Sequence, residues 1–343
     1  MQINKFFSIP IITRTLIASA LILLPLTSSA TDIHSRILKM PIVNAIDHPQ
    51  GVGAKVFAEE VAKNSNGKIK IKIFPNGTLG GEQQVASAMQ GGTIEVSMMS
   101  PAQIVGTVPQ FIVLDFPFTL KNEAQADAVL DGPFGKQLMS YMPEKGWVGL
   151  AYMEQGYRSI SNNKRPINTL EDIKGLKIRT ILNPLYIDML NALGANAIPM
   201  PFPELYTAME TKTVDGQENP ETSIDANKYY EVQKYFSGTR HIYNPQMLMV
   251  SKKLWDQLSE DERQIFQQAA LTARDAQRQF AREMTEKSRA NLLANGMQLN
   301  EISAAELARM QSVVQPVIDK YAAKLDPELV KQFQQELART NNL

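Results

Sequence analysis

The stretch 174–220 constrains the fold most, because short strand patterns alternate there with helix patterns and polar residues stand where these patterns begin or end. A strand is expected to end at Arg179, a helix to begin near Glu204, and Asn219 stands just before a proline. Strands and helices in this order favour a mostly parallel sheet, and ligands of such sheets bind at the carboxyl ends of the strands. A guanidinium group offers paired donors that match a carboxylate. The stretch therefore predicts a site for a small anion.

Arg179 and Asn219 also have structural interpretations. An arginine at the end of a strand is commonly a surface ion-pair partner, and an asparagine just before a proline is commonly a turn former. Asp215 and Glu218 could in principle do acid/base work, but we expect them to flank the turn that presents Asn219. The residues alone leave these alternatives open.

The chain before this stretch shows the same alternation. Its period-two and helical patterns predict, in order, a strand at 38–43, a helix at 52–64, a strand at 68–72, a helix at 82–91 and a strand at 93–99. This order places Glu82 at the beginning of a helix and Ser100 at the carboxyl end of a strand. Both are candidates for the same kind of site.

Two α/β regions joined by crossings predict a two-lobe periplasmic binding protein fold, type II-like, which closes on its ligand like a hinge. The first crossing is expected at 154–156. We expect lobe I to comprise 31–155 and 245–284, and lobe II to comprise 156–244 and 285–343 with the C-terminal helices.

The longest helix is expected near the end of the chain. Ser259 and Glu262 have the spacing of a capping box, and apolar and small residues then recur every three or four positions. With Gly296 as the stop, roughly 35 residues would span on the order of 50 Å, which is longer than one lobe is wide. We therefore expect the helix to lie across both lobes. The alternative, a coiled-coil dimer seam, lacks a leucine-rich heptad.

The segment 1–30 has the features of a signal peptide. Lys5 and Arg14 precede the apolar run 16–26, and small residues lead up to Ala30. We expect cleavage after Ala30 and a periplasmic mature protein. An uncleaved membrane anchor is the alternative, but the apolar run is short for one and contains Pro25.

Composition excludes several classes of function. The chain has no cysteine, so it has no disulfide, catalytic thiolate or lipid-anchored cysteine, and its formal net charge of zero argues against a nucleic-acid partner. Its three histidines do not share metal-ligand spacing, and common catalytic signatures are absent. We therefore expect no metal, no cofactor and no catalysis, and we expect a monomer.

Five segments together resemble one known family. They read Gly-Leu-Lys-Ile-Arg at 175–179, Leu-Gly-Ala-Asn at 193–196, Glu-Leu-Tyr-Thr-Ala-Met-Glu at 204–210, Val-Asp-Gly-Gln-Glu-Asn-Pro at 214–220 and Tyr-Glu-Val-Gln-Lys-Tyr at 230–235. This set resembles the solute-binding proteins of tripartite ATP-independent periplasmic (TRAP) transporters, the DctP family, over about 38–297. The resemblance implies that Arg179 clamps the ligand carboxylate, that Asn219 supports it, and that Arg158 is a second ligand-binding arginine. It also implies that Glu82 lies near the ligand and that the long helix joins the lobes.

The resemblance implies that the protein captures an organic acid and delivers it to a membrane permease. Polar residues suited to a polyol favour a hexuronate or related sugar acid over a C4-dicarboxylate, although Arg158 could hold either a second carboxylate or hydroxyl groups. The candidate ligand-binding residues are Arg179, Arg158, Asn219, Glu82, Asn44, Phe202, Gln155, Asn183 and Ser100. The alternatives from other classes are a periplasmic enzyme acting on a sugar acid and a ligand-presenting sensor subunit.

Overall fold

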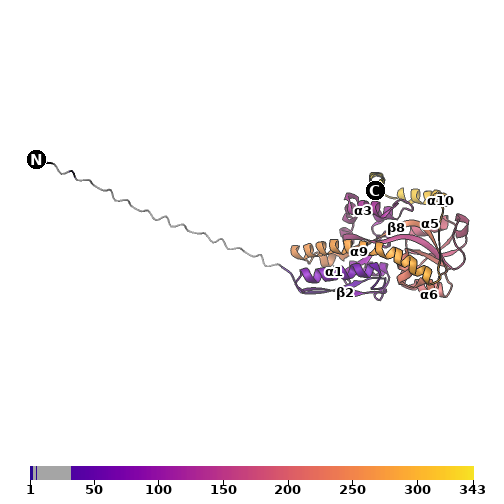
Figure 1. Ribbon diagram of the computed structural model, residues 1–343, viewed down its shortest axis with the longest axis horizontal. Coiled ribbons are helices and arrows are strands. Elements are labelled where there is room, and N and C mark those ends of the chain that lie inside the picture. Colours follow the sequence, from indigo (N-terminus) through magenta and orange to yellow (C-terminus); the bar gives the residue numbers. More distant parts are fainter. Residues whose placement is uncertain (3–4, 6–31) are drawn as a thin grey trace. The chain divides into compact units, whose positions relative to one another are not determined.

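The computed structural model describes residues 1–2, 5 and 32–343, and the fold is formed by Asp32–Leu343 (Figure 1). The predicted signal peptide 1–30, with its cleavage site after Ala30, lies outside the described residues except for Met1, Gln2 and Lys5. Within the described part of the chain, no helix is both long enough and apolar enough to cross a membrane.

A mixed seven-stranded sheet runs through the centre of the fold in the order β3-β8-β4-β7-β5-β6, with β9 paired to β8. The strands are β3 (Val96–Met99), β4 (Trp147–Asn162), β5 (Lys177–Thr180), β6 (Asn196–Pro199), β7 (Gly216–Asn219), β8 (Tyr235–Ser251) and β9 (Gln298–Glu301). A separate pair of parallel strands is formed by β1 (Arg36–Pro41) and β2 (Ile69–Phe74).

The sheet is less parallel than the sequence predicts. Strand β5 pairs in parallel with β6 and β7, as expected. The long strands β4 and β8, however, run antiparallel to each other from Trp147, opposite Ser251, to Asn162, opposite Tyr235. Both crossings are continuous strands, and they pair with each other in the antiparallel direction, whereas β5 and β6, which are connected by α5, pair in parallel.

The predicted hinge at 154–156 is part of a continuous strand. It lies inside β4, where the pairing with β8 shifts register between Glu154 and Gly156. Gly156 has φ of +109°, a conformation that favours glycine. A β-bulge bends a strand and increases its twist, so the crossing bends at this point without leaving the sheet.

Helices cover the sheets on both sides. They are α1 (Pro49–Asn64), α2 (Glu82–Gly91), α3 (Glu123–Asp131), α4 (Pro133–Ser140), α5 (Pro184–Ala192), α6 (Leu205–Glu210), α7 (Glu221–Ala226), α8 (Lys252–Trp255), α9 (Glu260–Ala294), α10 (Ala304–Ala322) and α11 (Pro327–Arg339). Short 3-10 turns include η1 (Pro101–Gln103) and η2 (Pro109–Asp115).

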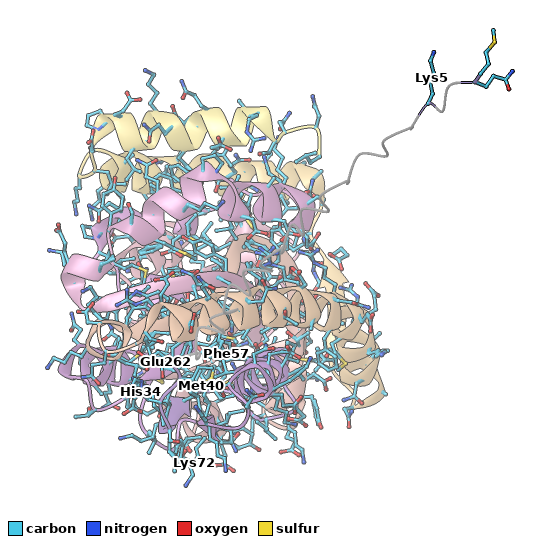
Figure 2. All side chains as sticks on the ribbon, turned by 90° about the vertical axis from the view of Figure 1, so that its left-hand side faces the viewer. Lys5, His34, Met40, Phe57, Lys72 and Glu262 are labelled. Carbon is cyan, nitrogen blue, oxygen red and sulfur yellow. The ribbon has the colours of Figure 1, made fainter. Side chains whose placement is uncertain are left out.

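The 35-residue helix α9 confirms the prediction of one long helix with a capping box. The Ser259 hydroxyl accepts from the Glu262 amide at 3.2 Å, and the Glu262 carboxylate accepts from the Ser259 amide at 3.0 Å. The first half of α9 packs on α1, where the ring of Phe266 meets the ring of Phe57 edge-on, with 5.8 Å between the ring centres. Phe57 is labelled in Figure 2. Its last turns pack on α7, and Leu292 joins a different apolar cluster there. One helix therefore contributes to two cores.

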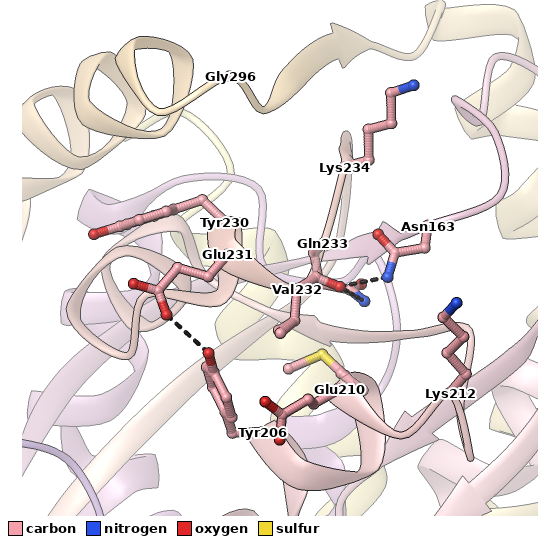
Figure 3. Close-up of a pocket in the computed structure, with 11 residues that line it drawn as sticks. Asn163, Tyr206, Glu210, Lys212, Tyr230, Glu231, Val232, Gln233, Lys234 and Gly296 are labelled. Atoms are coloured by element: carbon pink, nitrogen blue, oxygen red, sulfur yellow. Dashed lines mark hydrogen bonds between the residues drawn. The ribbon is translucent and has the colours of Figure 1, made fainter.

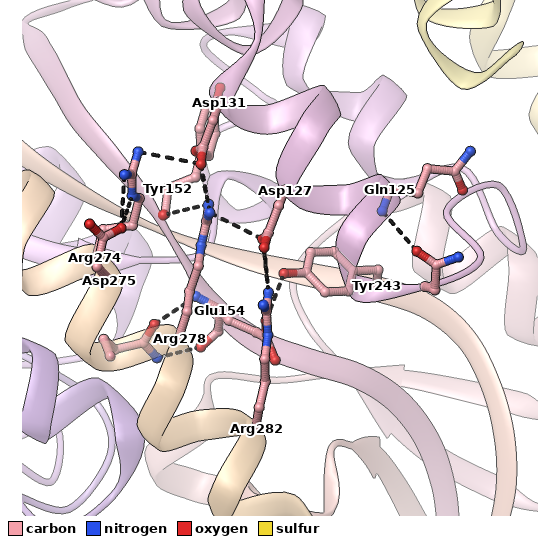
Figure 4. Close-up of polar contacts among 12 residues, drawn as sticks. Gln125, Asp127, Asp131, Tyr152, Glu154, Tyr243, Arg274, Asp275, Arg278 and Arg282 are labelled. Carbon is pink, nitrogen blue, oxygen red and sulfur yellow. Dashed lines mark hydrogen bonds and ion pairs between the residues drawn. The ribbon is translucent and has the colours of Figure 1, made fainter. Parts of the chain in front are cut away.

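A polar cluster fixes the middle of α9 to the bulged part of β4 (Figure 4). The Gln277 side chain donates to the backbone oxygen of Glu154 at 2.6 Å and accepts from its amide at 2.9 Å. Arg282 binds the Glu154 carboxylate at 2.7 Å, and Arg278 binds Asp131 at 2.7 Å. The long helix and the crossing strand are thereby held in register at the predicted hinge.

Candidate carboxylate-binding site

Arg179 lies on β5 as a buried cation, and it contacts no carboxylate in the part of the chain that the structure describes. Its side chain is 1% exposed. The Nε and Nη2 atoms donate to the backbone oxygen of Met200 at 3.0 and 2.7 Å, and the guanidinium carbon lies 5.8 Å from the Phe202 ring centre. Among the described residues, Nη1 has no hydrogen-bond partner. Burial lowers the pKa of Arg179 to about 10, so it stays charged at neutral pH.

Arg158, on β4, is paired with Glu218 on β7. Nη2 of Arg158 donates to Oε1 of Glu218 at 2.8 Å, and Nε donates to Oε2. Glu218 also accepts from the Thr180 hydroxyl at 2.9 Å, and His241 Nε2 lies 3.3 Å from its other oxygen. Burial alone would raise the pKa of Glu218, but Arg158 and His241 lower it to about 2. The carboxylate is therefore charged at neutral pH.

Asn219 is the last residue of β7 and is buried, with its amide nitrogen donating to the Gln217 side chain. The strands that carry Arg158, Asn219 and Arg179 are neighbours in the order β4-β7-β5. The structure therefore brings these three predicted residues together on one part of the sheet.

Glu82, the first residue of α2, is connected to Arg158 through hydrogen bonds of Ser100 and Asn244. Its Oε1 accepts from the Ser100 amide at 3.3 Å, and the Ser100 hydroxyl accepts from Asn244 Nδ2 at 2.8 Å. The Asn244 oxygen in turn accepts from Arg158 Nη1 at 3.3 Å. Partial burial raises the pKa of Glu82 to about 7, although the Ser100 amide and the charges of Arg158 and Arg179 lower it.

Asn44 and Gln155 belong to a chain of buried side-chain hydrogen bonds that the sequence does not reveal. Asn44 Nδ2 donates to Gln50 Oε1 at 2.9 Å, and Gln50 Nε2 donates to Gln246 at 3.0 Å. Gln246 donates to Gln155, which reaches the Ser223 hydroxyl at 3.4 Å. Both predicted residues have polar partners without ligand, and their contact with a ligand stays a prediction.

His48 contacts two members of this chain of hydrogen bonds, Gln50 and Ser223. Its Nδ1 accepts from the Gln50 amide at 3.0 Å, which makes it the N-cap of α1, and its Nε2 lies 3.1 Å from the Ser223 hydroxyl on α7. Burial lowers the pKa of His48 to about 3. A neutral histidine therefore links α1 to α7.

Asn183 has little free hydrogen-bonding capacity. Its amide donates to the backbone oxygen of Ala102 and to Asp115, both at 3.0 Å, and its oxygen caps α5 by accepting from the Leu185 amide at 2.9 Å. Burial raises the pKa of Asp115 to about 8. A ligand-binding role for Asn183 stays a prediction, and its observed contacts position α5.

Two hollows in the surface share Tyr206 as a lining residue. One, of about 250 Å³, is lined by Phe202, Tyr229, Tyr206, Asn227, Val43, Asn76 and Pro203. The other, of about 500 Å³, lies between α6 and 230–234 (Figure 3), where the Tyr206 hydroxyl donates to Glu231 at 2.8 Å. None of the predicted ligand-binding residues lines the second hollow.

Several residues of the cluster were not predicted. Glu218 was interpreted as flanking a turn, His241 was considered only as a possible metal ligand, and Asn244, Gln246 and Gln50 were not considered. Their only sequence signal is weak, because each is a polar residue in or next to an apolar run. A polar residue that a strand pattern forces into the interior needs a partner, and this is the reasoning that could have found them.

Within the described residues, Arg179 is buried without an ion-pair partner and lies beside a second arginine, on a sheet whose two crossing strands connect α/β regions. This arrangement is typical of an α/β solute-binding protein with two lobes. The chain belongs to the DctP family, described as bacterial extracellular solute-binding protein, family 7, whose sequence model matches residues 42–325. The predicted TRAP family and two-lobe fold are confirmed.

Related proteins of the family differ in their named ligands. One similar solved structure is that of the sugar acid binding protein DctPAm from Advenella mimigardefordensis in complex with galactonate. Its sequence is 41% identical to this chain, the TM-score is 0.88, and the match covers 90% of this chain and 100% of that chain. The 2,3-diketo-L-gulonate-binding periplasmic protein YiaO of Escherichia coli is 39% identical over 69% of this chain and 73% of its own length. The C4-dicarboxylate-binding periplasmic protein DctP of Rhodobacter capsulatus is 33% identical over 86% and 89%.

Proposed function

We propose that this protein captures a hexuronate or related sugar acid in the periplasm and delivers it to a TRAP membrane permease. The observation that carries the proposal is the buried guanidinium of Arg179, which is charged and has a free Nη1 among the described residues. A buried charge is costly unless it is paired. A ligand carboxylate would supply the missing partner and accept a charge-assisted hydrogen bond.

The pairing of Arg158 with Glu218 favours a sugar acid over a dicarboxylate as the ligand. Because Glu218 already binds its Nε and Nη2, the guanidinium has little positive charge to offer a second carboxylate. Asn219, Glu82 and Asn244 offer amide and carboxyl groups that suit hydroxyl groups. The galactonate and diketogulonate named for the two relatives are sugar acids as well. A C4-dicarboxylate is the second candidate, because the Rhodobacter capsulatus relative is named for it.

We assign the ligand contacts to Arg179, Arg158, Asn219, Glu82 and Phe202, with Asn44, Gln155, Asn183 and Ser100 around them. The lobes are divided as the sequence predicts, at 31–155 with 245–284 and at 156–244 with 285–343. Cleavage after Ala30 releases a periplasmic monomer. Co-purification with a permease supports delivery to a transporter, whereas co-purification with a histidine kinase ectodomain indicates a sensor subunit.

The protein does no chemistry on its ligand in this proposal. Glu218, a candidate for acid/base work, is held as a charged carboxylate with a pKa of about 2, far from the neutral range that suits a general acid or base. Incubation of ligand with protein, followed by NMR, tests this. Stoichiometric binding without a product agrees with a transport role, and turnover would identify a periplasmic enzyme.

A thermal-shift screen tests the ligand class. D-galactonate, D-galacturonate, D-glucuronate and succinate are added to the mature protein, because a ligand at 100 times its dissociation constant adds about 2.7 kcal/mol of stability. We expect at least one sugar acid to raise the melting temperature and succinate to leave it unchanged. A shift with succinate alone would establish the dicarboxylate candidate.

A further inference from the structure

When both of its carboxyl groups are ionised, the charges of the candidate site balance before any ligand binds. Two guanidinium groups, Arg158 and Arg179, lie near two carboxyl groups, Glu218 and Glu82. Glu218 is committed to Arg158. Glu82 accepts a hydrogen bond from the Ser100 amide, and among the described residues it forms no ion pair. While Glu82 is ionised, a bound anion would therefore add a negative charge to a site whose two positive charges are already balanced overall, although Arg179 has no carboxylate in direct contact among the described residues.

Glu82 is the group whose charge can change in response. The polar and charged groups that act on it come from the segment after β3 and from the sheet: Ser100, Gln103, Arg158 and Arg179. Arg158 in turn interacts with Asp115 and Glu218, and Glu218 interacts with His241. The Ser100 hydroxyl and Asn244 join it to Arg158 by hydrogen bonds. Protonation of Glu82 removes one negative charge and adds one hydrogen-bond donor at this position.

We propose that Glu82 takes up a proton when a singly charged hydroxy acid binds, and that this coupling makes the site reject dianions. The inference rests on the proposed function, because it requires the ligand carboxylate to bind Arg179. The ligand then shares the positive potential of Arg179 that otherwise stabilises the Glu82 carboxylate. Its own negative charge also disfavours a second nearby anion.

The expected pH dependence follows from the direction of this change. Without ligand the pKa of Glu82 is about 7, and bound ligand raises it further. The bound state therefore holds more protons than the free state between pH 7 and 8. Affinity for a monoanion falls as pH rises, by about tenfold between pH 6 and pH 8 if only the protonated form binds.

The same coupling discriminates between ligands of similar shape. Galactonate and galactarate share a hydroxylated six-carbon chain, but galactarate has a second carboxylate. One proton on Glu82 offsets the charge of galactonate and leaves the second charge of galactarate without compensation. A buried, uncompensated charge is costly, so wild-type protein binds galactonate at least tenfold more tightly than galactarate.

The test is calorimetric titration of the mature chain with D-galactonate, in phosphate and in Tris, whose ionisation enthalpies differ. We expect an uptake of about half a proton per ligand at pH 7, rising as pH approaches 8. In Glu82→Gln, which is neutral at every pH, the uptake disappears, the affinity no longer falls with pH, and the preference over galactarate shrinks. Glu59→Gln, an exposed residue of α1, makes the same charge change and serves as the matched control.

The outcomes separate this inference from the proposed function. Galactonate that binds without proton uptake in the wild type, or with equal uptake in Glu82→Gln, overturns the role of Glu82 and leaves the sugar-acid function intact. If galactonate, galacturonate and glucuronate all fail to bind while succinate binds, both are overturned. A melting curve without ligand shows that Glu82→Gln is folded, and Glu82→Asp, which keeps a titratable carboxyl, should restore the uptake.

Discussion

Arg158 and Glu218 form a buried ion pair between neighbouring strands, with Nη2 of the arginine 2.8 Å from Oε1 of the glutamate and both side chains at most 2% exposed. The pair gives the two arginines of the site different roles. Arg158 is anchored without ligand, whereas the hydrogen bonds of the Arg179 side chain within the described residues go to one backbone oxygen. We therefore expect mutations of the two residues to separate stability from binding.

Removal of the charge of Glu218 should destabilise the protein without ligand. Glu218→Gln leaves Arg158 buried and unpaired, and breaking a buried pair in this way costs about 3–5 kcal/mol. Urea unfolding measures the loss. Glu171→Gln, which breaks the exposed pair with Arg309, is the matched control and should unfold close to wild type. An equally small effect for Glu218→Gln would show that Arg158 does not depend on this partner.

Arg158 should affect the choice of ligand more than Arg179 does. In Arg158→Ala, we expect affinity to fall unequally across galactonate, galacturonate and glucuronate, because their hydroxyl groups differ in position. Arg179→Ala should weaken all of them alike, since every one has the same carboxylate. Calorimetric titration of both variants measures the pattern. A uniform loss in Arg158→Ala would move this residue into the carboxylate clamp beside Arg179.

The sequence predicts the parts of the site that local pattern controls. Arg179 at a strand end, the capping box of Ser259 and the motif around Asn219 can each be identified within a few residues. Glu218 could not be assigned, because its partner Arg158 is distant in sequence and meets it only through the pairing of β4 with β7. The sequence places a crossing at 154–156, but the bulge at Gly156 could not be predicted, since the register of two long strands is a tertiary property.

Burial of His48 should lower the free energy of unfolding in mild acid. Its pKa is lowered from 6.5 to about 3 by burial, so below pH 6.5 the unfolded chain binds a proton that the folded chain cannot. Stability present above pH 6.5 is therefore lost as pH falls toward 3, by about 2 kcal/mol between pH 6.5 and pH 5.

The measurement compares urea unfolding of the wild type and His48→Asn at several pH values. Asparagine keeps a good N-cap for α1 and does not titrate. We expect the variant to be less stable than wild type at pH 7, because the contact with Ser223 is lost, and to depend less on pH. His34→Asn, whose side chain is 62% exposed, is the control. Parallel pH profiles for wild type and His48→Asn would contradict the prediction.

Arg179→Lys tests whether the geometry of the guanidinium or only its charge binds the ligand. Lysine keeps the positive charge but replaces a planar group of paired donors with a single mobile ammonium group. Charge-assisted hydrogen bonds contribute about 1.5–3 kcal/mol each, so losing one should weaken ligand binding roughly ten- to a hundredfold.

Without ligand this variant should melt close to wild type, because Arg179 contacts no carboxylate and the lysine can still donate to the backbone oxygen of Met200. Calorimetric titration beside a melting curve without ligand measures both properties, and Arg309→Lys on the surface of α10 controls for the exchange itself. Wild-type affinity in Arg179→Lys would mean that charge alone is sufficient. A much lower melting temperature before ligand is added would make Arg179 a structural residue, and the unpartnered Nη1 would then no longer support a carboxylate site.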